Sequence, residues 1–485
     1  MPTTLIRNAE LVVAWDGTGH VYLSGADVAW TDGALTHVGP SYAGPVDMEI
    51  PGRGLMVMPG LVDVHSHPSS EPMLKGLTDE VGTPGLYNSS LYEYLPIFRP
   101  PPDAVPDCAR VAYSELLLSG VTTVVDLSLP YDGWLDVAGD SGLRVVVGPM
   151  FRGARWFTPN GHVVDYEWDV PAGERAMVDA MRLLDRAAQH PSGRLTGMVV
   201  PAQIDTCTPG MLQDSHAEAT RRGVAWQTHA AQSVSEFHEI TRRHGFTPIG
   251  WLHHLGVLTD RSIIGHSIFL DDHPSTPWHT DQDLALLAAA GTSVAHCPTV
   301  FARRGIALRD MGRYRRAGVK VGIGTDTFPH NMLEEMRLAM YLARTQAGNP
   351  RTLTGGELFT AATSGGAAIL GRDDIGRLAP GCRADLVLVD LAHPAMRPGY
   401  DPLRSLLYAA ADRAIRSVWV DGAKVVEDGT VLTLDYKAAS AALHEAQARM
   451  VRDVPARDWA RRDVEAVSPR TFRHAGAAPV PRRDA

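Results

Sequence analysis

Cysteine is scarce in this sequence. Four cysteines lie far apart in 485 residues, and no Cys-x-x-Cys pair occurs. This usage excludes a fold stapled by disulfides and a zinc site built from thiolates. No apolar run is long enough to cross a bilayer, and the first residues lack the basic-then-apolar order of a secretory signal. We therefore expect a cytoplasmic protein with reduced thiols and no membrane partner.

A surplus of positive charge is also missing, because the formal net charge is −10. This balance gives no reason to expect nucleic acid or an anionic membrane as a partner. Apolar residues make up 45% of the chain and charged residues 21%, which is ordinary for a globular protein. No internal repeat or low-complexity block is evident.

The middle of the chain alternates short apolar segments, rich in β-branched residues, with helical patterns. This alternation is typical of parallel strands wrapped by helices, and eight such strands close a (β/α)8 barrel of the TIM type. The predicted strands are 61–64, 122–126, 144–148, 197–200, 224–228, 262–265, 292–295 and 320–324. We expect an α/β fold whose catalytic barrel covers residues 56–374.

Both ends of the chain have a different pattern, that of short strands separated by turns. Such segments occur before residue 40 and return at 384–389 and 415–422. They predict one small β domain made from residues 1–55 and 375–430. Residues 431–485 are expected to add a helix and a tail, and the tail from about Asp453 shows little periodicity.

Histidine is plentiful, with 20 residues, and several follow the predicted strands directly. His65 and His67 end the first barrel strand, where residues i and i+2 share a face and can hold one metal ion. Two polar residues at a strand end would be an ordinary alternative. Barrels of this type, however, place their catalytic groups at this end of the strands.

Three further strands end in a residue of metal-ligand type: His229 after strand five, His266 after strand six and Asp326 after strand eight. Each one alone could be a hydrogen-bonded core histidine or a helix-capping aspartate. Five such residues at one mouth of one barrel are hard to explain as packing. Imidazoles with a carboxylate suit zinc, iron or a related divalent ion rather than calcium.

These motifs resemble the amidohydrolase superfamily over residues 52–426. The resemblance is carried by the run 59–67 with its His-x-His pair, by His229 and His266, by Gly324-Thr325-Asp326, and by the run 375–387. His296-Cys297-Pro298 after strand seven is similar to the branch that holds guanine, cytosine and S-adenosylhomocysteine deaminases and the triazine hydrolases. The run 375–387 resembles the family's return to a small β-sandwich domain.

The resemblance implies a role for each of these residues. His65, His67, His229 and Asp326 would hold the ion, His266 would bind it or the attacking water, and Asp326 would also accept a proton from that water. Members with two metals bridge them by a lysine at the end of strand four, where this chain has only residues such as Pro201 and Gln203. One divalent ion is therefore expected, zinc in the first place, with iron, cobalt or manganese as alternatives.

The main departure from the resemblance is Gln232. The deaminases commonly carry a glutamate there, three residues after the strand-five histidine, and it moves a proton to the leaving nitrogen. An amide cannot carry a proton in this way. Either another group replaces the glutamate, with Glu71, His254, His330 and Glu335 as candidates, or the leaving group needs less help. Phenylurea and thiocarbamate hydrolases look similar to this chain around residues 65–77.

The substrate pocket is expected from the loops after strands one to three, which hold several aromatic residues. Tyr92 and Trp156 are the aromatic candidates, although such residues often just cover a barrel end, and they would favour a flat or apolar molecule. The other candidate substrate residues are Glu71, Gln203, His296 and His330. Arg152 and Arg155 are candidates for binding a carbonyl or carboxylate group, or are solvated.

The sequence thus predicts a metal-dependent hydrolase that cleaves a non-peptide C–N bond of a small amide-, urea- or carbamate-like molecule with metal-activated water. Asp326, His266 and Gln232 are its predicted catalytic residues. The alternative is a deaminase or dechlorinase of a purine, pyrimidine, pterin or triazine ring. A non-catalytic metal-binding barrel is the remote alternative. The only partners expected are the small-molecule substrate and further copies of the chain in a homo-oligomer.

Overall fold

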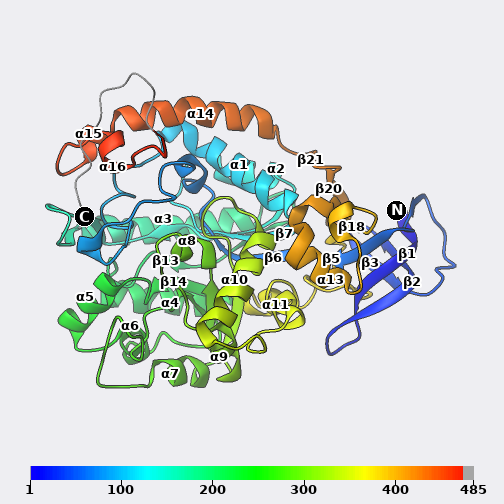
Figure 1. Ribbon diagram of the computed structural model, residues 1–485, viewed down its shortest axis with the longest axis horizontal. Coiled ribbons are helices and arrows are strands. Elements are labelled where there is room, and N and C mark those ends of the chain that lie inside the picture. The colour runs from blue at the N-terminus through cyan, green and yellow to red at the C-terminus, as the bar shows by residue number, and fades with distance from the viewer. Residues whose placement is uncertain (1, 473–485) are drawn as a thin grey trace.

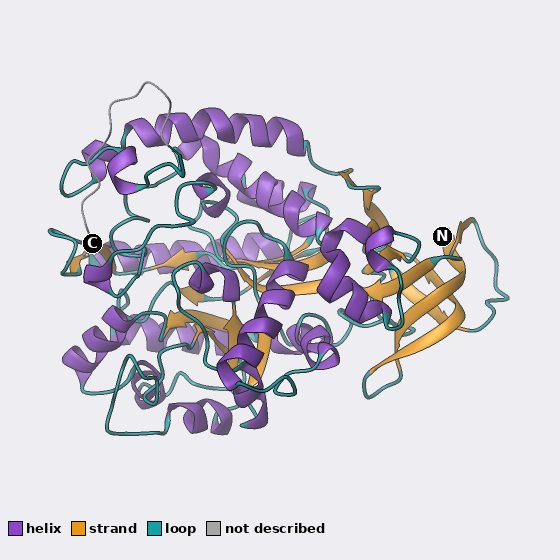
Figure 2. Ribbon diagram, in the orientation of Figure 1, coloured by secondary structure: helices purple, strands orange, loops and turns teal. Residues whose placement is uncertain are grey.

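The computed structural model describes residues 2–472 and has parallel strands at its centre, which confirms the α/β class. Figure 2 shows these strands surrounded by helices. The central strands are β6 (Leu61–Ser66), β7 (Val121–Asp126), β8 (Arg144–Val147), β9 (Met150–Phe151), β12 (Leu195–Gly197), β13 (Val200–Pro201), β14 (Trp226–Ala230), β15 (Ser262–His266), β16 (Ser293–His296) and β17 (Lys320–Ile323). They fall on or beside the eight predicted strand segments.

The central strands pair in two parallel sheets of four, in the orders β12-β8-β7-β6 and β14-β15-β16-β17, and β13 pairs with β9. Isolated parallel bridges occur between Ser66 and Asp326 and between Val199 and Trp226, at the two edges where these sheets meet. Every residue of β6, β7, β14 and β15 is buried. Burial on both faces explains why the apolar residues of these strands do not alternate regularly with polar ones.

The two ends of the chain form one nine-stranded sheet, at the right of Figure 1. Its order is β21-β20-β19-β18-β5-β1-β2-β3, with β4 paired to β1. The strands are β1 (Thr3–Trp15), β2 (His20–Thr31), β3 (Ala34–Gly39), β4 (Met48–Pro51), β5 (Leu55–Pro59), β18 (Leu386–Asp390), β19 (Ile415–Val420), β20 (Ala423–Glu427) and β21 (Thr430–Val431). The strand pairing confirms neither a closed eight-stranded barrel nor a sandwich, so both stay predictions.

The terminal sheet contributes side chains to two hydrophobic cores, one on each of its faces. Val57 of β5 belongs to a core enclosed by the sheet itself, together with Leu386 of β18. The neighbouring residues Met56 and Val387 belong to the main core around the central strands. Because successive side chains of a strand point to opposite faces, one sheet joins the two cores.

The helices follow the central strands and continue to the end of the described chain. They are α1 (Val105–Leu118), α2 (Trp134–Asp140), α3 (Val170–Ala188), α4 (Pro209–Arg222), α5 (Val234–His244), α6 (Pro248–His254), α7 (Asp283–Ala289), α8 (Pro298–Ala302), α9 (Met311–Arg316), α10 (Met332–Ala347), α11 (Gly355–Ala361), α12 (Ser364–Ile369), α13 (Pro402–Ser405), α14 (Tyr436–Arg452), α15 (Val454–Arg457) and α16 (Val464–Val467). A short hairpin of β10 (Ala154–Phe157) and β11 (Asp165–Trp168) precedes α3.

Helix α14 lies alongside α1 and covers the loop that follows β6 (Figure 1). Leu443 and Met450 of α14 pack in one cluster with Cys108 of α1 and with Met73 and Leu74 of that loop. A helix was predicted in this part of the chain. Residues 473–485 of the predicted tail lie outside the described residues.

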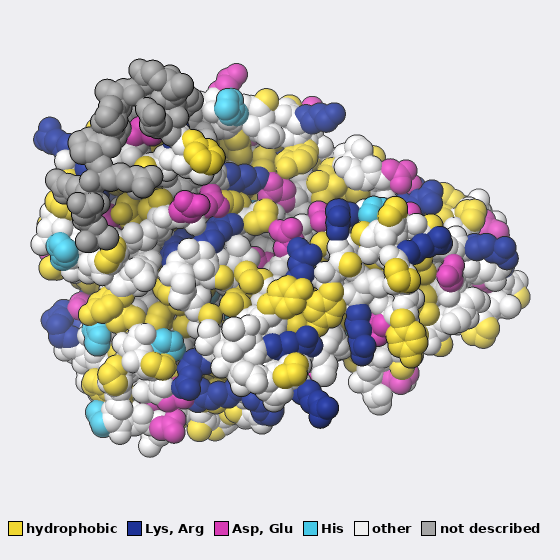
Figure 3. Space-filling view, viewed as in Figure 1, with side chains coloured by type: hydrophobic (Ala, Val, Ile, Leu, Met, Phe, Trp, Pro, Cys, Tyr) yellow, Lys and Arg dark blue, Asp and Glu magenta, His cyan; other side chains and the backbone are white. Residues whose placement is uncertain are grey.

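No helix among residues 2–472 is both long and apolar enough to cross a membrane. On the face drawn in Figure 3, positively and negatively charged side chains are interspersed. The predicted lack of a nucleic-acid partner stays a prediction.

Candidate metal centre

The end of β6 carries the predicted pair of histidines. His65 is fully buried, and its ring centroid lies 5.2 Å from that of His67. Two glycines make room for His65: a Cβ on Gly265 would lie 2.9 Å from His65 Cε1, and one on Gly324 would lie 2.7 Å from His65 Cβ. The glycines that precede His266 and Asp326 thus admit the His65 imidazole between the strands.

Backbone carbonyls hold His67 and His229 in one tautomer. His67 Nδ1 lies 2.6 Å from the carbonyl oxygen of Leu127, and His229 Nδ1 lies 2.6 Å from that of Ala202. A carbonyl only accepts hydrogen bonds, so each Nδ1 carries the proton and each Nε2 keeps its lone pair. The two Nε2 atoms lie 3.2 Å apart. Two lone pairs that face each other in this way are stabilised by a cation between them.

His65 is oriented in the same manner by Gln227. Its Nδ1 donates to Oε1 of Gln227, whose amide nitrogen lies 3.3 Å from the carbonyl oxygen of Val64, so the amide orientation is fixed. His65 Nε2 is buried and has no hydrogen-bond partner. Burial lowers the pKa of His65 well below its usual value, so the ring is neutral. A third imidazole lone pair is therefore free for a metal ion.

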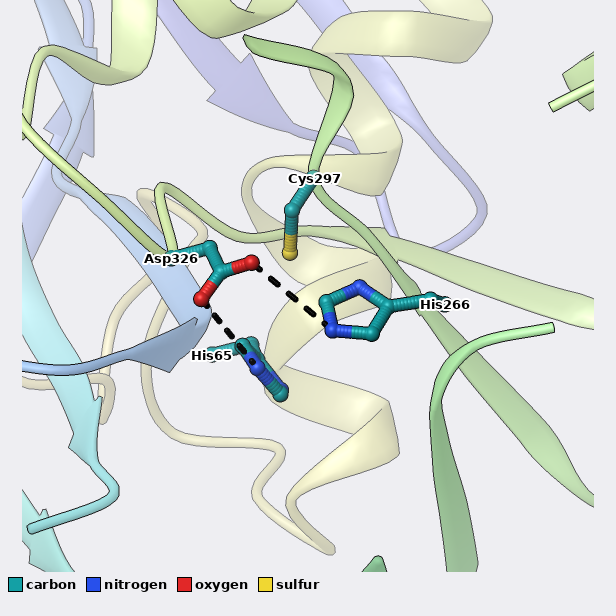
Figure 4. A group of neighbouring side chains, drawn as sticks. All are labelled: His65, His266, Cys297 and Asp326. Atoms are coloured by element: carbon teal, nitrogen blue, oxygen red, sulfur yellow. Dashed lines mark ion pairs between the residues drawn. The ribbon is translucent and has the colours of Figure 1, made fainter. Parts of the chain in front are cut away.

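Asp326 brings a carboxylate to His65 and His67 and to a fourth imidazole, that of His266. Its Oδ1 lies 3.3 Å from His67 Nε2 and 3.7 Å from His65 Nε2, and its Oδ2 lies 3.7 Å from His266 Nε2. Figure 4 shows Asp326 between His65 and His266. Ligands at the usual zinc distances in a tetrahedron are about 3.3 Å from one another. The spacing among these side chains is thus close to that of one metal site.

The backbone at two of these residues is strained. His266 has a φ of 84° and Asp326 a φ of 58°, both in the left-handed region that residues other than glycine seldom adopt. Buried Asp63 supports the chain next to Asp326, because it accepts hydrogen bonds from Thr325 Oγ1 at 2.6 Å and from the His65 backbone nitrogen at 3.0 Å. Strain that is held in this way clusters at functional sites.

Cys297, which the sequence offered only as part of the motif His296-Cys297-Pro298, lies within the cluster of candidate ligands. Its sulfur and ligand atoms of His65, His266 and Asp326 all lie within 4.8 Å of one another. Burial raises the pKa of the Cys297 thiol well above its usual value. Because only a thiolate binds zinc, Cys297 fits a neutral neighbour of the site better than a ligand. The sequence feature that could have identified Cys297 is its position directly after β16.

A family model decides what kind of protein this is. The model described as the amidohydrolase family matches residues 56–425, which is most of the chain. The chain belongs to the amidohydrolase family.

Several relatives of this amidohydrolase are similar over nearly their whole length. An 8-oxoguanine deaminase from Pseudomonas aeruginosa is 31% identical over 466 residues, which cover 92% of this chain and 99% of that protein. A 5-methylthioadenosine/S-adenosylhomocysteine deaminase from Pelotomaculum thermopropionicum is 29% identical over 461 residues, which cover 93% and 99%. These relatives confirm the predicted branch and the predicted class, a metal-dependent hydrolase of C–N bonds other than peptide bonds.

Solved structures show the same likeness. An adenosine deaminase from Xanthomonas campestris with bound zinc has a TM-score of 0.79 and 25% identity, covering 92% of this chain and 98% of that chain. An atrazine chlorohydrolase from Arthrobacter aurescens in complex with zinc has a TM-score of 0.77 and 23% identity, covering 92% of this chain and 100% of that chain. At this identity, the similarity shows a shared fold. The converging lone pairs of the amidohydrolase described here suit the same kind of ion.

We predict that zinc affinity depends on one proton between about pH 5 and pH 7. Burial raises the pKa of Asp326 to about 7, while burial lowers that of His229 to about 3. In the metal-free protein the imidazoles are therefore already neutral, and only the protonated Asp326 carboxyl competes with the ion. Affinity should rise about tenfold per pH unit up to about pH 7 and then level off, because binding releases one proton.

A competition titration with a chromophoric chelator measures this slope. The Asp326→Asn variant is its control, because that variant has no carboxyl to deprotonate and its slope should be close to zero. An affinity in the wild type that is flat from pH 5 to pH 7 would contradict the proposed role of Asp326 as a ligand.

Two glutamines lie beside the strand-five histidine of the amidohydrolase. Gln232 is 3% exposed, and its Nε2 is buried without a hydrogen-bond partner. It follows Ala231, which has a φ of 54°. Gln203 forms an isolated bridge with His229, and its Oε1 accepts from Thr206 Oγ1 at 3.0 Å. Both predicted residues are thus adjacent to a predicted ligand.

The two aromatic candidates form one buried wall. Tyr92 and Trp156 meet edge to face with ring centroids 5.2 Å apart. The Tyr92 hydroxyl pairs with Ser233 Oγ at 2.8 Å, and Trp156 Nε1 donates to Asp205 Oδ2 at 2.8 Å. Asp205 is fully buried; sequence patterns did not single it out, because a lone aspartate in a loop carries no motif. Both rings are held rigidly, and their part in substrate binding stays a prediction.

The other candidates take different places. Glu71 accepts a hydrogen bond from the hydroxyl of Thr327, the residue after Asp326. His296 ends β16 and is 4% exposed, and burial lowers its pKa to about 4. His330 is fully buried, and its Nδ1 lies 3.7 Å from Glu115. Glu71 therefore lies next to the metal centre, whereas His330 lies beside the carboxylate of Glu115.

The two remaining proton-carrier candidates are engaged elsewhere. His254, at the end of α6, stacks on Phe246 with centroids 4.7 Å apart. Glu335 on α10 accepts from the Thr299 nitrogen at 3.1 Å, and burial raises its pKa to about 8. Neither makes a hydrogen bond or ion pair with a predicted metal ligand among the described residues.

Proposed function

We propose that this amidohydrolase uses one divalent ion, zinc in the first place, to cleave a non-peptide C–N bond of a small amide-, urea- or carbamate-like molecule. The observation that carries the proposal is the convergence of neutral His65, His67 and His229 with Asp326 at distances suited to a single ion. One ion is proposed because the end of strand four has Pro201 and Gln203 where a bridging lysine would be needed.

The catalytic steps are assigned to residues around this site. When bound, the ion lowers the pKa of a water molecule and polarises the substrate carbonyl. Asp326 accepts the proton of the attacking water, for which a carboxyl with a pKa raised to about 7 by burial is well suited. His266, 3.7 Å from Asp326 Oδ2, is placed to stabilise the developing oxyanion. Gln232, three residues after His229, orients the substrate through its buried side-chain amide.

We assign the return of the proton to the leaving nitrogen to Glu71. Burial raises its pKa, the charge of Asp326 raises it further, and His67 acts in the opposite direction. The Thr327 hydroxyl, which donates to Glu71 Oε2, fixes the carboxyl beside Asp326. A carboxyl held in this place supplies the proton transfer that the Gln232 amide cannot supply.

The variant Glu71→Gln tests this assignment. We expect kcat to fall about 10²- to 10⁴-fold, the usual contribution of a positioned acid or base, because the amide keeps the hydrogen bond to Thr327 but carries no proton. Steady-state kinetics and zinc analysis measure the effect, and zinc content should not change. Unchanged kcat in a zinc-loaded Glu71→Gln protein would refute the assignment. Glu334→Gln on the surface of α10 serves as the matched control.

The second candidate function is a deaminase or dechlorinase of a heteroaromatic ring. It is favoured by relatives that are named deaminases and by the chlorohydrolase with a similar fold. Zinc-loaded protein assayed with phenylureas and carbamates, and in parallel with purines, pyrimidines, pterins and chlorotriazines, separates the two. Turnover of a urea or carbamate supports the first proposal. Ammonia or chloride from the ring compounds, without urea turnover, overturns it.

We further propose the architecture that goes with this function. The bridges at Ser66–Asp326 and Val199–Trp226 support a closed (β/α)8 barrel over residues 56–374. Residues 1–55 and 375–430 would form the β-sandwich domain, and 431–485 the C-terminal helix and tail. A small-molecule substrate, a homo-oligomer and a cytoplasmic location complete the proposal.

A further inference from the structure

A long loop between β6 and α1 carries two of the candidate site residues, Glu71 and Tyr92. Over residues 67–104 it forms only three short 3-10 turns, at Glu71–Leu74, Pro84–Leu86 and Pro102–Ala104. Loops of this length without regular structure of their own are uncommon in compact domains and are usually functional. Contacts with other parts of the chain must therefore fix the conformation of this loop.

The C-terminal segment 436–468 supplies several of these contacts, and its helices lie over the loop in Figure 1. The Ser468 hydroxyl donates to the carbonyl oxygen of Leu77 at 2.6 Å. Trp459 Nε1 donates to Oε1 of Glu93, the residue after Tyr92, at 2.9 Å. Together with the apolar cluster between α14 and the loop, these hydrogen bonds hold the loop from its outer side.

The contact of this segment that lies nearest to Glu71 in the chain is made by Gln447 of α14. Its side-chain nitrogen Nε2 donates to the carbonyl oxygen of Met73 at 2.7 Å and to that of Lys75 at 3.0 Å. A side-chain amide has two N–H donors, so both can be used on this short stretch of backbone. Gln447 therefore binds the far end of the turn that begins at Glu71.

The near end of the same turn lies at the metal centre. The Glu71 backbone nitrogen donates to the carbonyl oxygen of His67 at 3.3 Å, and the Glu71 carboxyl accepts from the Thr327 hydroxyl. His67 is a proposed ligand, and Thr327 follows another, Asp326. Because the turn has only four residues, a displacement of its far end also displaces the Glu71 carboxyl.

The loop has a second attachment close to this turn. The Lys75 ammonium pairs with Glu115 of α1, and Glu115 also accepts from the Tyr436 hydroxyl of α14 at 3.2 Å. These contacts do not involve Gln447. A variant at Gln447 should therefore keep the loop folded and shift only the turn.

We propose that Gln447 is a positioning residue, which holds the turn 71–74 so that the Glu71 carboxyl can give its proton to the leaving nitrogen. This inference rests on the proposed function, in which Glu71 carries that proton. Gln447 acts through the backbone of the turn, because it makes no hydrogen bond with a proposed metal ligand among residues 2–472.

The test is a double-mutant cycle of Gln447→Met and Glu71→Gln in zinc-loaded protein. Methionine has a similar size but donates no hydrogen bond. Gln447→Met should lower kcat about tenfold, because a small misplacement of a reacting group is costly, while KM and zinc content stay unchanged. In the Glu71→Gln background the same substitution should change kcat less than about twofold, because the group that it misplaces is already gone.

Two further variants serve as controls. Gln447→Lys keeps donors at a similar reach and should restore most of kcat. Gln213→Met is the matched control, because Gln213 of α4 also donates to a backbone carbonyl, that of Leu255 at 3.2 Å, but at the exposed surface. It should leave kcat within about twofold of the wild type.

Hydrogen exchange gives a readout that needs no substrate. In Gln447→Met the amides of residues 73–78 should exchange about fivefold faster, the factor that a typical hydrogen bond contributes. They should exchange at the wild-type rate in Gln213→Met. Unchanged exchange in Gln447→Met, unchanged kcat, or an equal fall of kcat in both backgrounds overturns the proposal.

Failure of the proposed function gives a different result. Unchanged kcat in Glu71→Gln refutes the assignment of Glu71 and this inference with it. If the wild type turns over only ring compounds, the proposed substrate class fails. The same cycle, measured on the ring compound, then still decides whether Gln447 positions Glu71.

Discussion

Replacing Asp326 by Asn should lower kcat by about 10³-fold or more. The variant loses a proton acceptor, which contributes about 10²- to 10⁴-fold, and it loses the only carboxylate among the proposed metal ligands. Its amide has nearly the same shape, so the packing against His65 and Cys297 is retained. Steady-state kinetics on whichever urea or carbamate the wild type turns over, together with zinc analysis, measures both losses.

The stability of the metal-free variant separates a chemical from a structural effect. Burial raises the pKa of Asp326 to about 7 from a value of 3.8, so the folded chain holds this proton more tightly than the unfolded chain. The free energy of unfolding therefore falls as the pH rises from about 4 through about 7. Asn carries no charge, and metal-free Asp326→Asn should be at least as stable as the wild type at pH 8.

With zinc present, the wild type should be more stable to unfolding than Asp326→Asn, because an ion stabilises only the chain that binds it. Asp179→Asn is the matched control, since Asp179 pairs with Arg182 on the exposed surface of α3. An Asp326→Asn protein that keeps its zinc and its kcat would rule out the proposed mechanism.

Replacing Arg144 by Met should lower the free energy of unfolding by about 3–5 kcal/mol, the cost of leaving a buried charge unpaired. Arg144 begins β8, and its Nε and Nη2 lie 2.6 and 3.1 Å from the two oxygens of Asp385, next to β18. Nη2 also lies 2.6 Å from Asp421. The side chains of Arg144 and Asp385 are 5% and 1% exposed. This pair joins the central strands to the terminal sheet.

Urea denaturation of Arg144→Met measures the loss. Arg182→Met is the matched control at an exposed ion pair and should cost less than about 1 kcal/mol. The double variant Arg144→Met with Asp385→Asn should regain part of the stability, because it removes the buried charge that the single variant leaves behind. Equal losses for Arg144→Met and Arg182→Met would contradict the account of this junction.

The strand ends of the site were predictable from the sequence because each ligand follows an apolar run. Runs such as Ser262–His266 are buried throughout, and burial on both faces requires the β-branched composition by which the run is recognised. The residues that orient the candidate ligands were not predictable from the sequence. Gln227 acts on His65 and Asp63 acts on Thr325, residues that are distant in the chain, and no local pattern indicates such contacts.

The sequence by itself determined the family, the α/β class and the identity of the candidate metal ligands, because these depend on local periodicity and on residue types at strand ends. Only the tertiary structure decided that the three Nε2 lone pairs face one another and Asp326, since ring orientation depends on the carbonyls of Leu127 and Ala202 and on Gln227. It also brought the Glu71 carboxyl to the hydroxyl of Thr327, the residue after Asp326. The reason is physical: burial and the distance between charges set their chemistry, and both arise only when separate loops meet.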